Sequence, residues 1–290
     1  MTNKQPHQPN WWPHSTTCWN EVSNYLLTAE IPVQTISQQT NWKRLSKGQT
    51  NQNYQLKCSN KQYFVQILCR KSSQLQPATD FVQLNSLLRN HTALNRWLVA
   101  CHFESSHSKI DEWYESNEPI NQDFEQTDFI DSLVEFLVSL HSGDAFLSVD
   151  RQRLPAIDIE EYLARYRRLA LENSPQNMSE IEALYNRSAP LIAQFCADAF
   201  CHNDLSSQNL LWSKQNGLKV IDWEYAGWGD RTMDLANLIL CCQLSPAQEA
   251  LLLNNYNNKA FKIISLDKLE PMKELASIIN QLWFLAREKS

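Results

Sequence analysis

Apolar residues change their spacing along the chain, and this change predicts two kinds of structure. Residues 15–30 begin with Ser and Thr and carry apolar residues at helical spacing. Short strand-like runs, separated by turn sequences such as SKGQTN and SNK, then follow at 41–45, 52–58, 62–69, 96–103 and 109–119, with a helical run at 78–90. We therefore expect residues 15–119 to form a small sheet with one or two helices.

From residue 122 onward the spacing is mostly that of amphipathic helices. Helical runs cover 122–142, 158–173 and 178–199, the last interrupted near Pro190, and a further helical region covers 231–290. Two short strand-like runs, NLLW and LKVIDW, stand between them. A strand-rich part followed by a helix-rich part is typical of the α+β class. We place an N-terminal lobe at 1–118, with residues 1–14 as a loosely docked tail, and a C-terminal lobe at 119–290.

Composition narrows the class of partner. The 290 residues are 43% apolar and 20% charged, which is typical of a globular protein, and the net charge is −6. Without a long Lys/Arg run, nucleic acid is not an expected partner. No secretory signal and no membrane-spanning run are evident, and the eight scattered Cys suit a reducing compartment. We therefore expect a cytoplasmic protein with no membrane insertion.

Candidate chemistry is concentrated in two polar loops set between apolar runs. The first, HNDLSSQN, contains Asp204 and Asn209, and the second, VIDWEYAG, contains Asp222. If NLLW and LKVI pair as a hairpin, Asn209 and Asp222 face each other at its open end. A carboxylate and an amide oxygen are ligands that Mg²⁺ prefers, and Asp204 nearby is available to accept a proton. A base beside a metal site meets the needs of phosphoryl transfer.

These motifs resemble those of a known family. HNDLSSQN has the pattern H-x-D-x-x-x-x-N, and VIDWEYAG stands where kinases carry a metal-binding Asp-Phe-Gly. With GWGDRTMDLANL, they resemble the aminoglycoside phosphotransferase and choline kinase superfamily, closest to choline kinases and bacterial thiamine kinases. The strong part of the resemblance covers about 200–240, and LVEFLVSLHS and SKGQTNQNY extend it weakly. It implies a bilobal protein-kinase-like fold, with a small β-rich N-terminal lobe and a larger, mostly helical C-terminal lobe.

The resemblance also implies roles for individual residues. Asp204 resembles the catalytic base, and Asn209 and Asp222 resemble Mg²⁺ ligands in an ATP-dependent enzyme. His202 and Asp234 resemble residues that support the catalytic loop, although on composition alone a polar turn would also explain the first loop. The other histidines, His141 among them, show no ligand spacing. The turn that would face the phosphates of ATP comprises Gly48, Gln49, Thr50 and Asn51.

One expected group is missing from the third strand of the N-terminal part. Kinase-like sheets supply a Lys or Arg there, paired with a Glu on the next helix, but this chain has Gln66, and the helix offers Gln83 or Asp80. The two changes fit each other, because together they leave no unpaired buried charge. Arg70 or Lys71, just after the strand, is a candidate for the missing cation. This departure keeps open a second reading, a kinase-fold binding module with little activity.

The residues after Asp222 predict which kind of substrate accepts the phosphoryl group. Glu224, Tyr225 and Trp228 offer a carboxylate and aromatic faces, which suit a cationic alcohol such as choline or thiamine through cation–π attraction. Packing in the core is the alternative explanation for these aromatic residues. An aminoglycoside is a second candidate acceptor, although a polycation calls for a denser acidic cluster. A metal-dependent hydrolase using Asp204 and Asp222 is a further alternative.

Overall fold

The computed structural model describes residues 6–45, 51–58, 61–68, 81–116, 120–142 and 154–287. Contacts divide the chain into two compact units, one of residues 1–74 and 99–114 and the other of residues 75–98 and 115–290. The predicted lobe boundary at 118/119 differs from this division, since residues 75–98 group with the second unit. The α+β class is confirmed, because one unit is built on a sheet and the other mainly on helices.

The first unit contains a five-stranded antiparallel sheet in the order β1-β2-β3-β5-β4. Its elements are helices α1 (Thr16–Thr28) and α2 (Val33–Ser37) and strands β1 (Trp42–Arg44), β2 (Gln52–Cys58), β3 (Lys61–Ile67), β4 (Cys101–Glu104) and β5 (Ser108–Glu112). The first three strands agree with those predicted, but the run predicted at 96–103 forms a strand only from Cys101, after a 3-10 helix at Asn95–Trp97, and the run predicted from 109 ends as a strand at Glu112. Alternate residues of β3, namely Tyr63, Val65 and Ile67, are buried with residues of α1 in one apolar cluster. One face of the sheet therefore packs on the helix.

Residues 6–14 are not a loose tail. Trp12 is only 3% exposed and stacks on Tyr54 of β2, with ring centroids 5.7 Å apart. Trp11 packs against Trp12, Trp19 and Trp42, and the indole of Trp19 donates to the carbonyl of Pro6 at 2.9 Å. The polar composition of the segment suggested a tail, but two adjacent indoles bury enough apolar surface to hold it against the sheet.

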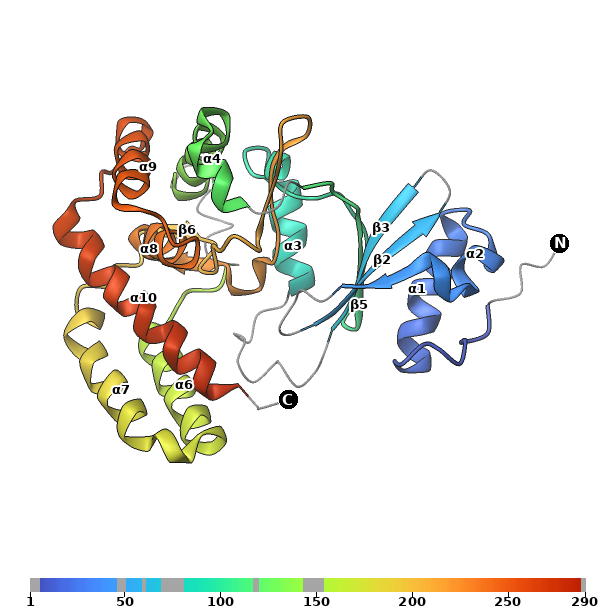
Figure 1. Cartoon of the computed structure of the whole chain (residues 1–290), viewed down its shortest axis with the longest axis horizontal. Helices are drawn as coiled ribbons and strands as arrows, with labels where there is room; N and C mark the ends of the chain where they lie inside the picture. The colour runs from blue at the N-terminus through green and yellow to red at the C-terminus, as the bar shows by residue number, and fades with distance from the viewer. Residues whose placement is uncertain are drawn as a thin grey trace. The chain divides into compact units, whose positions relative to one another are not determined.

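The second unit is mostly helical. It contains α3 (Phe81–Asn90), α4 (Thr127–His141), α6 (Ile159–Asn173), α7 (Met178–Ile192), α8 (Arg231–Cys241), α9 (Pro246–Lys259) and α10 (Leu266–Ala286). Helix α10 packs against α6, α7 and α8 (Figure 1). Helix α7 continues through Pro190 and ends two residues later, at Ile192, so the predicted interruption at Pro190 is wrong and the helix is shorter than the predicted 178–199.

Two small antiparallel strand pairs lie within this unit. Strands β7 (Leu210–Ser213) and β8 (Gly217–Val220) form a hairpin, and β6 (Ala199–Cys201) pairs with β9 (Gly227–Gly229). The chain at Pro155 approaches β9 so closely that a Cβ on Gly227 would stand 2.7 Å from the carbonyl oxygen of Pro155. Only glycine fits such an approach. These strands hold both polar loops in place.

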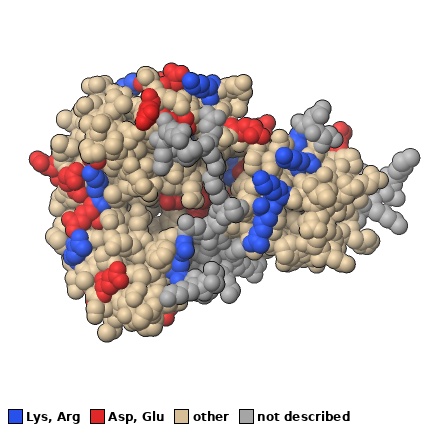
Figure 2. Space-filling model, in the orientation of Figure 1, with Lys and Arg blue, Asp and Glu red and all other residues tan. Residues whose placement is uncertain are grey.

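No helix among the described residues is long and apolar enough to cross a membrane. Acidic and basic side chains are interspersed on the face drawn in Figure 2, so the charge on this face is of mixed sign.

Candidate active site

The first polar loop connects β6 to the β7–β8 hairpin. The predicted hairpin is present, with Leu210 opposite Val220 and Ser213 opposite Gly217. The backbone N–H of Ile221 also donates to the carbonyl of Asn209 at 3.0 Å, which extends the pairing by one residue. The open end of the hairpin therefore places Ile221 opposite Asn209, so Asp222 is one residue beyond the position directly opposite Asn209 that the sequence predicted.

Asn209 binds Asp204 twice. Its amide nitrogen donates to the backbone carbonyl of Asp204 at 2.8 Å and to the carboxylate Oδ2 at 2.9 Å. Both amide hydrogens are thus used on one side, and the amide oxygen accepts no hydrogen bond from the part of the chain that the structure describes. The arrangement orients the carboxylate of Asp204 and leaves the oxygen of Asn209 available for a cation.

Asp222 contributes a second carboxylate close to Asp204. Burial, which is the largest cause, and the negative charge of Asp222 together raise the pKa of Asp204 to about 8, although the hydrogen bond from Asn209 acts in the opposite direction. Asp222 adopts a left-handed backbone conformation, with φ 65° and ψ 60°, which non-glycine residues adopt rarely. The carboxylates of Asp204 and Asp222 repel each other, and Asp222 stands on a rarely adopted backbone conformation. A divalent cation bound between them would remove this repulsion.

His202 connects the two loops as a neutral imidazole. Its Nε2 lies 3.0 Å from the carbonyl oxygen of Ile221, and its Nδ1 lies 3.3 Å from the backbone N–H of Asp204. A carbonyl can only accept and an N–H can only donate, so the proton is on Nε2. Burial lowers the pKa of His202, which favours this neutral form. The ring also packs on Trp223, with centroids 4.7 Å apart.

Asp234 of helix α8 holds the start of the first polar loop. The carboxylate accepts from the backbone N–H of His202 at 2.8 Å and from that of Asn203 at 2.7 Å. Asn203, like Asp222, has a positive φ, here 62°. Helix α8 begins at the N-cap Asp230, whose Oδ1 accepts from the N–H of Thr232, so Asp234 lies in the first turn. The residue is fully buried.

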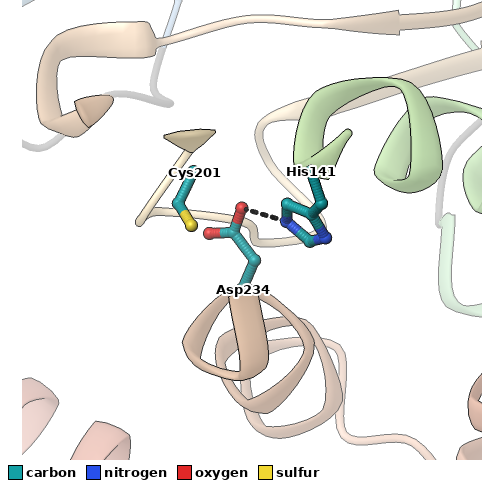
Figure 3. Close-up of side chains that lie close together, drawn as sticks. All are labelled: His141, Cys201 and Asp234. Carbon is teal, nitrogen blue, oxygen red and sulfur yellow. Dashed lines mark hydrogen bonds and ion pairs between the residues drawn. The ribbon is translucent and has the colours of Figure 1, made fainter. Parts of the chain in front are cut away.

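A third partner of Asp234 comes from distant sequence. His141, at the end of α4, lies with its Nε2 3.1 Å from the carboxylate Oδ2 (Figure 3). Its Nδ1 lies 2.9 Å from the hydroxyl of Tyr256 on α9. The sequence assigned His141 no role, because its partner stands 93 positions away. The weak LVSLHS resemblance was the one signal that could have found it.

His141, Cys201 and Asp234 also form a group of metal-binding residue types, all buried (Figure 3). The carboxylate is already engaged by two backbone N–H groups and one imidazole at hydrogen-bond distances. Burial raises the pKa of the Cys201 thiol well above its usual value, so the thiolate that a metal requires is disfavoured. These residues therefore fit a hydrogen-bonded network better than a metal centre.

The residues after Asp222 differ in their surroundings. Trp223 and Trp228 are each 7% exposed and belong to the apolar core of the second unit. Glu224 and Tyr225 are half-buried. Core packing, the alternative considered for these aromatic residues, thus accounts for Trp223 and for most of the ring surface of Trp228.

Two aromatic residues that the sequence analysis did not single out lie near Asp204. Burial strongly raises the pKa of Tyr166 on α6, and Tyr225 and Asp204 lie close enough to influence it. Trp283 on α10 is close enough to the hydroxyl of Tyr225 to influence the pKa of that group. No local motif indicates Tyr166 or Trp283, because only tertiary packing brings α6 and α10 to this loop.

The predicted nucleotide residues belong to the first unit. Gly48, Gln49 and Thr50 lie outside the described residues, as do Arg70, Lys71 and Asp80, and the side chain of Gln83 is not described either. Asn51 directly precedes β2. Gln66 is half-buried on β3, opposite Asn53 of β2.

A family model matches most of this chain. The model of a phosphotransferase enzyme family matches residues 41–271. Protein LicA of Haemophilus influenzae is 36% identical over 88 residues, which are 29% of this chain and 33% of that protein. An uncharacterized protein of Metamycoplasma hominis is 35% identical over 65 residues, 22% of this chain and 13% of its own length. The matched segments are thus a third or less of these curated relatives.

Solved structures match over most of the chain. Choline kinase LicA from Streptococcus pneumoniae has a TM-score of 0.70 at 23% identity, covering 91% of this chain and 89% of that one. The Plasmodium vivax ethanolamine kinase has a TM-score of 0.67 at 14% identity, covering 95% and 84%. Spectinomycin phosphotransferase, solved with ADP and spectinomycin, has a TM-score of 0.59 at 15% identity, covering 83% and 80%. At these identities the likeness shows the fold alone, and the fold is the kinase-like one that the motifs predicted.

Proposed function

The chain belongs to the phosphotransferase enzyme family, and we propose that it transfers the γ-phosphoryl group of ATP to a hydroxyl of a small cationic alcohol, of choline or thiamine type. The observation that carries this proposal is the pair of hydrogen bonds from Asn209 to Asp204, beside the carboxylate of Asp222. Phosphoryl transfer depends mainly on positioning and on neutralising charge, and this group of residues offers a means for both.

Asp204 acts in this proposal as the base that orients the acceptor hydroxyl and takes its proton. The hydrogen bonds from Asn209 restrict the carboxylate to one orientation, which supports a role in positioning. Burial, the largest cause of the raised pKa of Asp204, makes the carboxylate a stronger base. His202 and Asp234 fix the backbone on which Asp204 stands.

Asn209 and Asp222 would hold Mg²⁺, which supplies charge neutralisation for the phosphates of the nucleotide. The donor set fits a hard cation, because the amide oxygen of Asn209 and a carboxylate of Asp222 are both oxygen ligands. The amide nitrogen of Asn209 is engaged with Asp204, so its oxygen points elsewhere. A nucleotide as the other substrate is supported by the relative solved with ADP. Gly48, Gln49, Thr50, Asn51 and Gln66 remain its predicted contacts.

A cationic acceptor is supported by the aromatic residues around Asp204. Tyr225 and Tyr166 influence each other's pKa, and Trp283 lies near the hydroxyl of Tyr225. Aromatic faces attract quaternary ammonium groups, and Glu224 adds a carboxylate whose negative charge is opposite to that of the acceptor. Trp228 remains a predicted contact, although little of its ring is exposed. The choline kinase and ethanolamine kinase relatives support acceptors of the same chemical type.

The proposal is tested with the full chain, Mg·ATP and a panel of acceptors comprising choline, ethanolamine, thiamine and kanamycin. Formation of the phosphorylated product is followed directly, for example by ³¹P NMR. We expect turnover of choline or thiamine well before kanamycin. Preferred turnover of kanamycin would overturn the proposed acceptor, and release of phosphate without a phosphorylated acceptor would indicate a hydrolase. Nucleotide binding with no turnover of any acceptor would favour a binding module.

A further inference from the structure

The sheet of the first unit has an apolar face and a polar face. On β3 the apolar residues Tyr63, Val65 and Ile67 pack in the core with helix α1, and Gln66 lies between two of them. Successive side chains of a strand point to opposite faces. Gln66 therefore belongs to the other face, where the basic residue of a kinase-like third strand is missing.

Lys109 of β5 lies next to Gln66 on that polar face. The two residues are partners in the antiparallel register of β3 and β5, and directly opposed residues present their side chains on the same face. Asp111 stands two residues further along β5, so it shares the face as well, and its Oδ2 lies 2.8 Å from the ammonium of Lys109. Gln66, Lys109 and Asp111 thus form one group on two neighbouring strands.

The two side chains of this ion pair differ in exposure. The side chain of Asp111 is 7% exposed and that of Lys109 is 24% exposed. Burial opposes the charge of Lys109, but the carboxylate of Asp111 outweighs it and raises the pKa of the ammonium above its usual value. Asp111 Oδ1 is buried without a hydrogen-bond partner among the described residues. A pair that is only partly hydrogen-bonded adds little to stability, so its placement calls for another explanation.

We propose that Lys109, oriented by Asp111 and flanked by Gln66, supplies the cation that contacts the phosphates of the bound nucleotide. In this proposal the positive charge is on Lys109 of β5, the residue adjacent to Gln66, instead of on the third strand. Asp111 orients the lysine, as a Glu on the following helix does in kinases. An ammonium has three donors, and Asp111 needs one of them. This inference rests on the proposed function.

A second carboxylate limits the strength of this contact. Glu104 of β4 is the register partner of Lys109 on its other side. Asp111 and Glu104 together carry more negative charge than Lys109 carries positive charge, so the positive potential at the ammonium is reduced. We therefore expect Glu104→Gln to tighten nucleotide binding by a few fold, the opposite direction to removal of Lys109.

The test is nucleotide binding by the full chain, measured by calorimetry with Mg·ADP, together with the KM for ATP. Lys109→Met is expected to weaken binding about tenfold to a hundredfold, since a charge-assisted contact to phosphate is lost. Lys57→Met is the matched control, because Lys57 is an exposed lysine on the same face of β2 and its loss should leave binding unchanged. Adding Gln66→Arg to Lys109→Met should restore binding, an effect that a merely structural role would not produce.

The outcomes separate this inference from the proposed function. If the wild-type chain binds no nucleotide, the proposed function fails. If it binds nucleotide and Lys109→Met binds within twofold of it, only the inference about Lys109 is overturned, and equal weakening by Lys57→Met would also overturn it. Lys109→Gln provides a polar second variant if the Met variant does not fold. Failure of Gln66→Arg to restore binding, in a variant that folds, would show that Lys109 supports the sheet instead.

Discussion

The amide of Asn209 donates to both the backbone carbonyl and the carboxylate of Asp204, at 2.8 and 2.9 Å. This one side chain therefore fixes the direction of the proposed base and, at the same time, its own orientation. Because both amide hydrogens are used, the oxygen of Asn209 cannot exchange places with its nitrogen without losing two hydrogen bonds. The proposed base and the proposed metal ligand are thus positioned by the same contact.

Replacing Asp204 with Asn is expected to lower kcat by about 10²–10⁴-fold, the usual contribution of a general base. The amide oxygen of the new Asn can still accept from Asn209, so the loop should keep its conformation. The measurement is kcat with the best acceptor, together with the KM for ATP, which should stay near the wild-type value. A kcat within tenfold of the wild type would mean that Asp204 is not the base.

Replacing Asp222 with Asn is expected to raise the Mg²⁺ concentration for half-maximal activity roughly tenfold or more, because a charged ligand is lost. Asn tolerates the left-handed conformation at φ 65°, so the backbone should be preserved. Activity is measured against Mg²⁺ concentration at fixed ATP. Asp128→Asn, at an exposed position of α4, is the control. Equal Mg²⁺ dependence in both variants would argue against a metal at Asp222.

Replacing Asp234 with Asn is expected to lower the free energy of unfolding by about 3 kcal/mol, since an amide group would face buried N–H groups that need an acceptor. Its carboxylate accepts from the backbone of His202 and Asn203 and from the side chain of His141. Urea unfolding provides the measurement, and Asp267→Asn at the exposed start of α10 is the control. A loss no larger than that of the control would show that Asp234 does not hold the loop.

Local sequence was sufficient to predict the β7–β8 hairpin, but not the contacts between residues that are distant in the sequence. The run NLLW, the turn SKQNG and the run LKVI contain all the information that the β7–β8 pairing requires. The contact of His141 with Asp234 depends instead on how α4 packs beside α8, which no spacing within either helix encodes. The position of Lys109 beside Gln66 likewise depends on the sheet order, in which β5 and not β4 is the neighbour of β3.

The segment before α1 shows a limit of a different kind. Its polar residues predicted a tail, yet Trp11 and Trp12 form a cluster with Trp19 and Trp42. Average polarity conceals two large apolar side chains, whose burial outweighs the solvation of their neighbours. Whether such a segment docks depends on a partner surface, and here that surface comes from α1 and β1.

The neutral state of His202 predicts a specific dependence of stability on pH. Burial lowers the pKa of His202 below its usual value of 6.5. As pH falls through 6.5, the unfolded chain therefore binds a proton at this residue that the folded chain does not, and the free energy of unfolding decreases by up to about 1.4 kcal/mol per pH unit. His202→Gln should remove this part of the pH dependence, because Gln does not titrate. The Gln amide can still donate to the carbonyl of Ile221, so the loop should keep its conformation. Urea unfolding between pH 7.5 and 5 measures it, with exposed His7→Gln as the control. Parallel curves for the wild type and His202→Gln would contradict a buried neutral imidazole.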